Sequence, residues 1–205
     1  MSVYSASETS HPFRRNSSTA RGRPTDAARS RRRATGARPN RRLAAARARA
    51  MHRLAQHLGP SWQVLETPLA DPVTTGDDHA GFVTIGPGGV FAITVVDQGR
   101  QRIMVAGDVV QIRGARPPHV ARARRYAKTV RAALSAAVGA TVPVVPVLTF
   151  VGSGAMSTHG LPVGCLVVNH RELDRLLRSI GEKIRPETAR KLAEVAGHPA
   201  TWGQR

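Results

Sequence analysis

The sequence has little of what secreted and membrane proteins need. Cys165 is the single cysteine among 205 residues, so no disulfide can form within the chain, which is typical of a reducing compartment. The N-terminus has no apolar core of the kind that a signal peptide requires. The longest apolar run, residues 141–152, contains Pro143 and Pro146 and is too short to cross a bilayer as a helix. These absences predict a cytoplasmic protein with no membrane partner.

Acidic residues are also scarce, and unevenly so. The chain has 31 Lys and Arg residues against 13 Asp and Glu residues, a net charge of +18. Residues 1–58 hold fourteen arginines and only Glu8 and Asp26, a net charge of +12. The positive electrostatic field of such a chain attracts phosphate polyanions, which predicts DNA or RNA as a partner. An Arg- and Ala-rich composition with only three lysines also follows from a GC-rich genome, so both interpretations of the basic tail stay open.

The chain divides into a tail and one domain. Residues 1–40 have few large apolar side chains and are predicted to be a disordered basic tail. Within this tail, Arg21-Gly-Arg23-Pro is similar to the core of an AT-hook, whose arginines enter a narrow minor groove. Residues 41–205 are predicted to form the domain, beginning with a helix that ends at Gly59-Pro60. Helical spacing gives this helix one apolar stripe, made by Leu43, Ala46, Ala50, Leu54 and Leu58.

The rest of the domain alternates between strands and helices. Strands are predicted over residues 62–69, 83–85, 90–96, 101–105, 109–113, 142–151 and 166–169. Further helices are predicted over residues 119–138, 171–180 and 186–196. The four residues Gly86-Pro-Gly-Gly89 lack the Gly-Lys-Ser/Thr ending of a phosphate-binding loop and are predicted to form a hairpin turn. This order favours an α/β fold with a mixed central sheet flanked by helices.

Five sequence pieces, in order along residues 43–202, carry a family resemblance. They are residues 58–65 (LGPSWQVL), 85–91 (IGPGGVF), 107–114 (GDVVQIRG), 143–148 (PVVPVL) and 200–202 (ATW). Together they resemble the nuclease-related domain family, called NERD, of the restriction-endonuclease-like superfamily. The resemblance implies a restriction-endonuclease-like fold whose hairpin presents an Asp on one strand and a Glu-x-Lys-type triplet on the next. It also implies a nuclease in which clustered carboxylates hold Mg²⁺ on the scissile phosphate.

The sequence departs from the family pattern at each of these positions. Aligned on the shared glycine turn, Gly81 stands where the family has its Asp, and His79 stands at an acidic position two residues earlier. The triplet falls on residues 94–96, which are Thr-Val-Val. No acid occurs between Asp26 and Glu66, where the family often has a helical Glu. A metal site without clustered carboxylates has no chemistry to offer, so we expect no cofactor and a lost nuclease activity.

Displaced residues offer an alternative, in which Mg²⁺ is bound at a rearranged site. Its weak catalytic candidates are Asp77, Asp78, His79 and Asp97. Asp97 lies one residue beyond the lysine position, and because strand side chains alternate it should face away from Thr94 and Val96. Asp77 and Asp78 lie in a polar loop, for which a solvated acidic loop is the simpler interpretation.

The basic residues of the helix over 119–138 are the better functional candidates. Arg122 and Arg125 share one helical side with Thr129, and three further cations lie beside it: Arg124, Lys128 and Arg131. With Arg21 and Arg23, these residues are predicted to contact nucleic-acid phosphates; a solvated helix face is the other interpretation. Few aromatic residues lie among them, so stacking on bases is not indicated. We expect a degenerate NERD-like protein that binds nucleic acid, with an active nuclease or a protein-interaction scaffold as alternatives.

Overall fold

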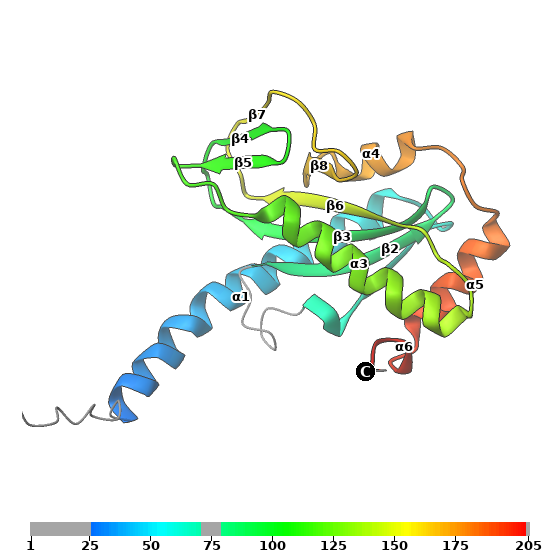
Figure 1. Ribbon diagram of the computed structural model, residues 1–205, viewed down its shortest axis with the longest axis horizontal. Coiled ribbons are helices and arrows are strands. Elements are labelled where there is room, and N and C mark those ends of the chain that lie inside the picture. The colour runs from blue at the N-terminus through cyan, green and yellow to red at the C-terminus, as the bar shows by residue number, and fades with distance from the viewer. Residues whose placement is uncertain (1–25, 71–78, 204–205) are drawn as a thin grey trace, which may run out of the picture.

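The structure is a computed structural model that describes residues 26–70 and 79–203 (Figure 1). For residues 26–40 and residue 70 only the backbone is described. Four residues that the sequence singles out lie outside the described residues: Arg21, Arg23, Asp77 and Asp78. Among the helices of the described ranges, none has the length and apolarity needed to cross a membrane.

The first helix, α1, spans Asp26–His57. It begins before residue 41, inside the segment predicted to be disordered, because Ala and Arg are both good helix formers. The five residues of the predicted apolar stripe are all buried, from Leu43 to Leu58. The helix stops just before Gly59, whose φ of +83° few other residues adopt. The predicted stripe and the predicted end of the helix are therefore confirmed.

Five strands form the central sheet in the order β1-β2-β3-β6-β8. Their bounds are Gln63–Glu66 for β1, Ala80–Gly86 for β2, Gly89–Asp97 for β3, Val144–Val151 for β6 and Leu166–Asn169 for β8. β1, β2 and β3 are antiparallel neighbours, whereas β6 and β8 run parallel to β3. The parallel pairing of β3 and β6 needs a long crossover, which α3 (His119–Val138) supplies. The predicted mixed sheet is confirmed.

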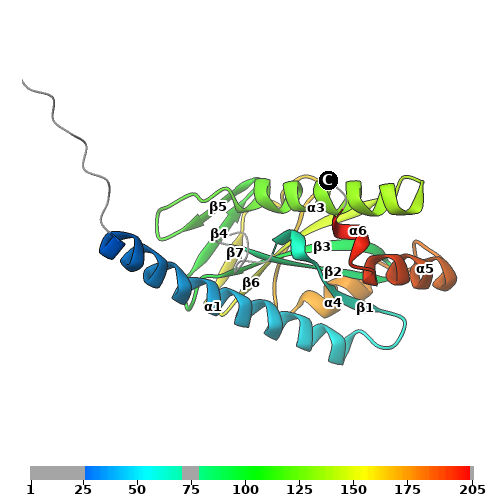
Figure 2. The ribbon, with the colours of Figure 1, turned by 90° about the horizontal axis from the view of Figure 1, so that it is seen from below.

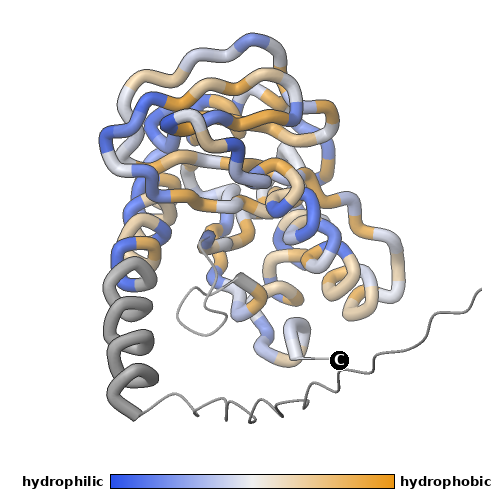
Figure 3. Tube along the Cα trace, turned by 60° about the vertical axis from the view of Figure 1, so that its left-hand side comes forward, coloured by the Kyte–Doolittle hydropathy of each residue, from blue (hydrophilic) through white to orange (hydrophobic). Residues whose placement is uncertain are grey.

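Helices cover both faces of this sheet (Figure 2). One face packs against α1 and α4 (Leu173–Ser179) through Phe82, Phe91 and Ile93. The opposite face packs against α3, α5 (Pro186–Gly197) and α6 (Ala200–Gly203) through side chains such as Val83 and Ala92. Hydrophobic residues accordingly concentrate along the central strands (Figure 3). The α/β class with flanking helices follows from this alternation of side chains.

A second, three-stranded sheet has the order β5-β4-β7. β4 (Ile103–Ala106) and β5 (Val109–Ile112) form the hairpin that the sequence predicts, and β7 (Met156–Thr158) pairs parallel to β4. This sheet packs on the first turns of α3 through Val120 and Ala123. The first strand of the domain is shorter than predicted, because Pro68 begins the 3-10 helix η1 (Pro68–Ala70).

The β2–β3 hairpin closes with Gly86 opposite Gly89, so that Pro87 and Gly88 form its two-residue turn. The ring of Trp62 covers Gly86 so closely that a Cβ atom there would lie 2.2 Å from the ring atom Cδ2. Only glycine fits beneath this ring. The same register places Gly81 directly opposite Thr94 at the far end of the hairpin.

Candidate nucleic-acid interface

The far end of the β2–β3 hairpin is where the family resemblance places a metal site. Gly81 and Thr94 share the face of the sheet that packs against α3, because Val83 and Ala92, two residues along each strand, contact that helix. The Thr94 hydroxyl is fully buried and makes no hydrogen bond to the described residues. In the described ranges no group of three or more His, Cys, Asp or Glu side chains could hold a metal ion. The described residues at this position therefore do not fit Mg²⁺.

Asp97 lies on the opposite face of the same sheet. Its carboxylate accepts a hydrogen bond of 2.9 Å from the Gly99 N–H and lies 3.7 Å from Arg42 and 4.0 Å from Arg49 of α1. Val96, one residue earlier, packs toward α3. The prediction that Asp97 faces away from Thr94 and Val96 is confirmed. This carboxylate balances the arginines of α1 and is not directed toward the hairpin end.

A hollow of about 420 Å³ lies beside α3, on the face that Gly81 and Thr94 share. Its lining comes from α3, from η1 and from the residue before β2: Leu69, His79, Pro118, Arg122, Arg125, Tyr126 and Thr129. We call this hollow the α3 pocket. It brings together three of the residues that the sequence singles out, namely His79, Arg122 and Arg125.

The geometry of α3 directs these side chains toward the pocket. One side of the helix is buried against both sheets, through residues such as Val120, Ala127 and Val130. Arg122, Arg125 and Thr129 lie on the neighbouring side at i, i+3 and i+7. The first turn of α3 contains no acidic residue and no side-chain cap, so the partial positive charge of the helix N-terminus adds to that of the arginines.

Tyr126 forms a neutral wall of the pocket. Its hydroxyl shares a buried hydrogen bond of 2.8 Å with the Thr67 hydroxyl. Burial raises the pKa of Tyr126 above its ordinary value and outweighs the opposing effects of that hydrogen bond and of the charge on Arg47. The phenol therefore stays uncharged at neutral pH. None of the described lining residues is a carboxylate, and two of them, Arg122 and Arg125, are cationic.

Arg124, which the sequence groups with Arg122 and Arg125, is used differently. Its two terminal nitrogens donate hydrogen bonds of 2.6 and 2.7 Å to the carboxylate of Asp108 in the β4–β5 turn, and Nη2 also donates to the Val163 carbonyl. The hydrogen bond from Arg124 lowers the pKa of Asp108. This arginine therefore ties α3 to the small sheet. Lys128 and Arg131 are exposed farther along α3.

Three residues that line the pocket are not among the candidates from the sequence: Leu69, Pro118 and Tyr126. Tyr126 follows Arg122 by one helical turn, so helical periodicity alone was sufficient to find it. Leu69 gives no such signal, because it reaches the pocket from η1, which is distant in sequence. A pocket formed by separate elements requires the tertiary structure.

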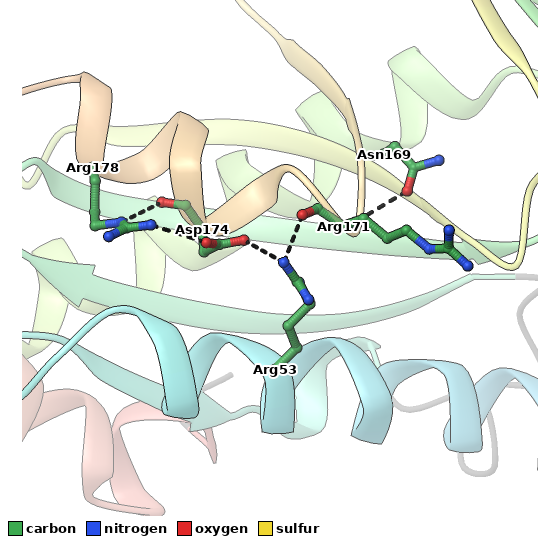
Figure 4. A network of polar contacts seen from close by, with 5 residues as sticks. All are labelled: Arg53, Asn169, Arg171, Asp174 and Arg178. Atoms are coloured by element: carbon green, nitrogen blue, oxygen red, sulfur yellow. Dashed lines mark hydrogen bonds and ion pairs between the residues drawn. The ribbon is translucent and has the colours of Figure 1, made fainter.

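Two other features are distinct from this interface. The buried carboxylate of Asp174 lies between Arg53 and Arg178 and joins α1 to α4, on the face away from the pocket (Figure 4). A second hollow of about 520 Å³ beside β6 and β8 is lined by apolar residues such as Leu161 and Leu176, and none of its described lining residues is charged. Neither feature offers a phosphate group an accessible cationic pocket.

The chain has no significant match among protein-family models, curated proteins or solved structures. Function is therefore inferred from side-chain placement. The described part of the chain combines a cationic pocket beside α3 with a hairpin end at which Gly81 and Thr94 supply no metal-binding carboxylate.

Proposed function

We propose that the protein is a nucleic-acid-binding relative of the NERD nucleases, with a restriction-endonuclease-like fold that has lost metal-dependent cleavage. The observation that carries this proposal is the α3 pocket. Arg122 and Arg125 line it beside the hairpin end where Gly81 and Thr94 occupy the expected ligand positions. Cationic side chains are thus concentrated where the family pattern expects a metal-binding acidic cluster.

The register of the hairpin supports the proposed relationship to nucleases. An Asp on one strand and a Glu-x-Lys-type triplet on the next can share a metal only if their strands place them side by side. Gly81 and Thr94 are direct cross-strand partners, and Cβ atoms at such positions lie about 4.5–5.5 Å apart. The positions are therefore suitably arranged, and the side chains that occupy them lack the chemistry.

Binding through these residues involves the phosphate backbone. Arg122 and Arg125 supply planar guanidinium groups that suit phosphate oxygens, and Lys128 and Arg131 extend the positive surface along α3. The tail arginines Arg21 and Arg23 add further contacts under this proposal. Phosphate contacts carry no sequence information, so DNA and RNA of any sequence are suitable ligands.

A salt series on duplex DNA tests the proposal. If the four cations of α3 contact phosphates, log K falls with log salt at a slope of about −3.6, so affinity falls roughly hundredfold between 50 and 200 mM salt. Arg175→Ala serves as a control and should leave this slope unchanged, because Arg175 is an exposed arginine of α4 on the other face of the sheet. Absence of binding at 50 mM salt, or binding that does not respond to salt, would contradict the proposal.

A cleavage assay distinguishes the proposal from the alternative, an active nuclease with a rearranged metal site. The full chain is incubated with DNA and with RNA in the presence of Mg²⁺ or Mn²⁺, and we expect no cleavage beyond the metal-only control. If cleavage occurs and is abolished by substitution of Asp77, Asp78, His79 or Asp97, the alternative is correct and the site has been rebuilt from displaced residues.

A further inference from the structure

We propose that two copies of this chain associate through the uncharged edge of the central sheet at β8. The surface consists of residues 161–169, which are the loop before β8 and the strand itself, together with the apolar hollow beside β6 and β8. We call this surface the β8 edge. The inference goes beyond the proposed function and does not depend on it, because the association needs no nucleic acid.

The absence of charge distinguishes the β8 edge from the rest of the chain. Residues 132–170 contain no Asp, Glu, Lys or Arg, although 21% of the chain is charged. Two copies that each carry a net charge of +18 repel one another wherever their cations meet. At the β8 edge they can meet without bringing like charges together. The cores of protein interfaces are likewise depleted in charged residues.

The loop before β8 exposes large apolar side chains. Leu161 and Val163 are 67% and 86% exposed, more than any other large apolar side chain in the described ranges. The loop is held at Val163, whose carbonyl accepts a hydrogen bond from Arg124, and Arg124 pairs with Asp108 of the β4–β5 turn. Val109, beside Asp108, is a third exposed apolar residue. Apolar side chains that gather in one place mark contact surfaces, whereas single ones need no explanation.

Next to this projecting loop the surface recedes. β6 pairs with β3 from Val144 onward, but with β8 only from Val147 onward. The first three residues of β6 therefore have no described strand beside them at this edge. The hollow of about 520 Å³ lies there, lined by β6, β8, the loop and Leu176 of α4. Its volume is many times the about 30 Å³ that a water molecule occupies in the liquid, so an apolar side chain fits within it.

β8 adds an open backbone edge to this surface. It is the last strand of the central sheet, and among the described strands only β6 pairs with it (Figure 1). Such an edge presents N–H and C=O groups to a further strand, and proteins commonly protect it with charged side chains, proline or a bulge. β8, which is Leu166–Asn169, contains neither a charge nor a proline. These backbone groups suit an extended chain as the partner.

A second copy of this chain meets these requirements. A two-fold interface needs one surface that is complementary to itself. Val163 projects beside the hollow and is not part of its lining, so a two-fold axis between them lets Val163 of each copy enter the hollow of the other. The same axis places the two β8 strands antiparallel to one another at their open edges. The β8 edge thus supplies both the projection and the hollow that receives it.

Sedimentation velocity tests the association. The full chain is treated with nuclease to remove bound nucleic acid and is measured over a concentration series. One loop and one short strand form a small contact, so we expect a weak dimer with a dissociation constant in the micromolar range. Repulsion between the copies is screened over about 10 Å at 0.1 M salt and about 3 Å at 1 M salt. The dimer should therefore become severalfold tighter at about 1 M salt, whereas phosphate contacts become weaker.

Exposed variants locate the contact. Val163→Lys and Leu161→Lys carry a charge into an apolar interface, so each should weaken the dimer at least about tenfold. Val138→Lys is the matched control, because Val138 is an exposed valine at the end of α3 and the variant adds the same charge. It should leave the dissociation constant unchanged, and Val163→Ile should retain the dimer. Circular dichroism verifies that each variant is folded.

Hydrogen exchange measured above and below the dissociation constant shows where the copies meet, and amides of residues 161–169 should exchange more slowly in the dimer. A chain that stays monomeric at about 1 M salt overturns the inference and leaves the edge to a strand of another protein. A dimer that Val163→Lys and Leu161→Lys leave unchanged lies elsewhere on the molecule and overturns it as well. Association that nuclease treatment abolishes is bridging by nucleic acid, which overturns the inference while supporting the proposed function.

Discussion

Asp174→Ala is the sharpest test of how the two helices on one face of the sheet are joined. The carboxylate accepts a hydrogen bond of 3.1 Å from Arg53 of α1 and another of 3.1 Å from Arg178 of α4 (Figure 4). Its side chain is only 7% exposed, whereas Arg53 and Arg178 are 34% and 54% exposed. The substitution removes both contacts and leaves two arginines that water can reach.

This difference in exposure determines how much stability Asp174→Ala should lose. Removing one partner of a fully buried ion pair costs about 3–5 kcal/mol, which is an upper limit here because water takes up the freed donors. Arg178 contributes about 0.5 kcal/mol, as an exposed pair does. Arg53 is better shielded, and its charged hydrogen bond contributes about 1.5 kcal/mol. We expect Asp174→Ala to lower the free energy of unfolding by about 2 kcal/mol, which is about 4–8 °C in Tm for a chain of this size.

Urea unfolding followed by circular dichroism measures the change, provided that the m-value is unaltered. Glu187→Ala is the matched control, because Glu187 is also an acid in the first turn of a helix but is exposed. Its loss is expected to cost about 0.5 kcal/mol through the helix dipole. If Asp174→Ala is as stable as the wild type, or if Glu187→Ala is equally destabilised, the carboxylate does not join α1 to α4 as argued.

The effect of Asp174 should also depend on pH. Burial by itself would raise the pKa of this carboxyl, but the hydrogen bond and the charge of Arg53 outweigh burial and lower the pKa. In the unfolded chain an Asp titrates near pH 3.9. The ion pairs therefore contribute their full stability above about pH 4 and lose it as pH falls through the lower folded-state pKa. The difference in unfolding free energy between wild type and Asp174→Ala should narrow below pH 4.

Two further substitutions test the packing at Gly86 and the different roles of Arg124 and Arg125 on α3. Gly86→Ala should destabilise the fold by about 1–3 kcal/mol, because the tryptophan ring above it leaves no space for a Cβ atom, whereas Gly197→Ala has open space and should cost nothing in the same urea assay. Arg124→Ala should weaken duplex binding less than Arg125→Ala, because Arg124 is paired with Asp108; anisotropy titrations at 50 mM salt measure the difference, and equal losses would contradict the pairing argument.

Local signals predict the parts of this fold that depend on neighbours in sequence. Helical spacing and flanking prolines give α3 as His119–Val138, and dense turn residues give the β2–β3 hairpin. The split into two sheets is not predictable in this way. β7 has only three residues and pairs with β4, about fifty residues earlier in the chain, so no local pattern records it.

The same distinction between local sequence signals and tertiary structure applies to the candidate interface. The spacing of Arg122 and Arg125 predicts that they share a helical side, and the structure places both at the α3 pocket. The spacing equally includes Arg124, and only the tertiary structure shows that Asp108 binds it. Charge in the sequence therefore identifies candidates, and for Arg124 only the tertiary structure shows that a carboxylate pairs with it.

Burial at the hairpin end explains why uncharged side chains stand at these positions. Thr94 is fully buried and Val96 is 1% exposed, so acidic or basic side chains at these positions would be charges removed from water. Such charges are tolerated only when a metal or a partner compensates them. Val96 needs no such compensation, and the uncharged hydroxyl of Thr94 costs less to bury than a charge would. Under the proposed function, phosphate recognition can pass to the arginines of α3, whose charge is permanent and whose side chains lie at the solvent boundary.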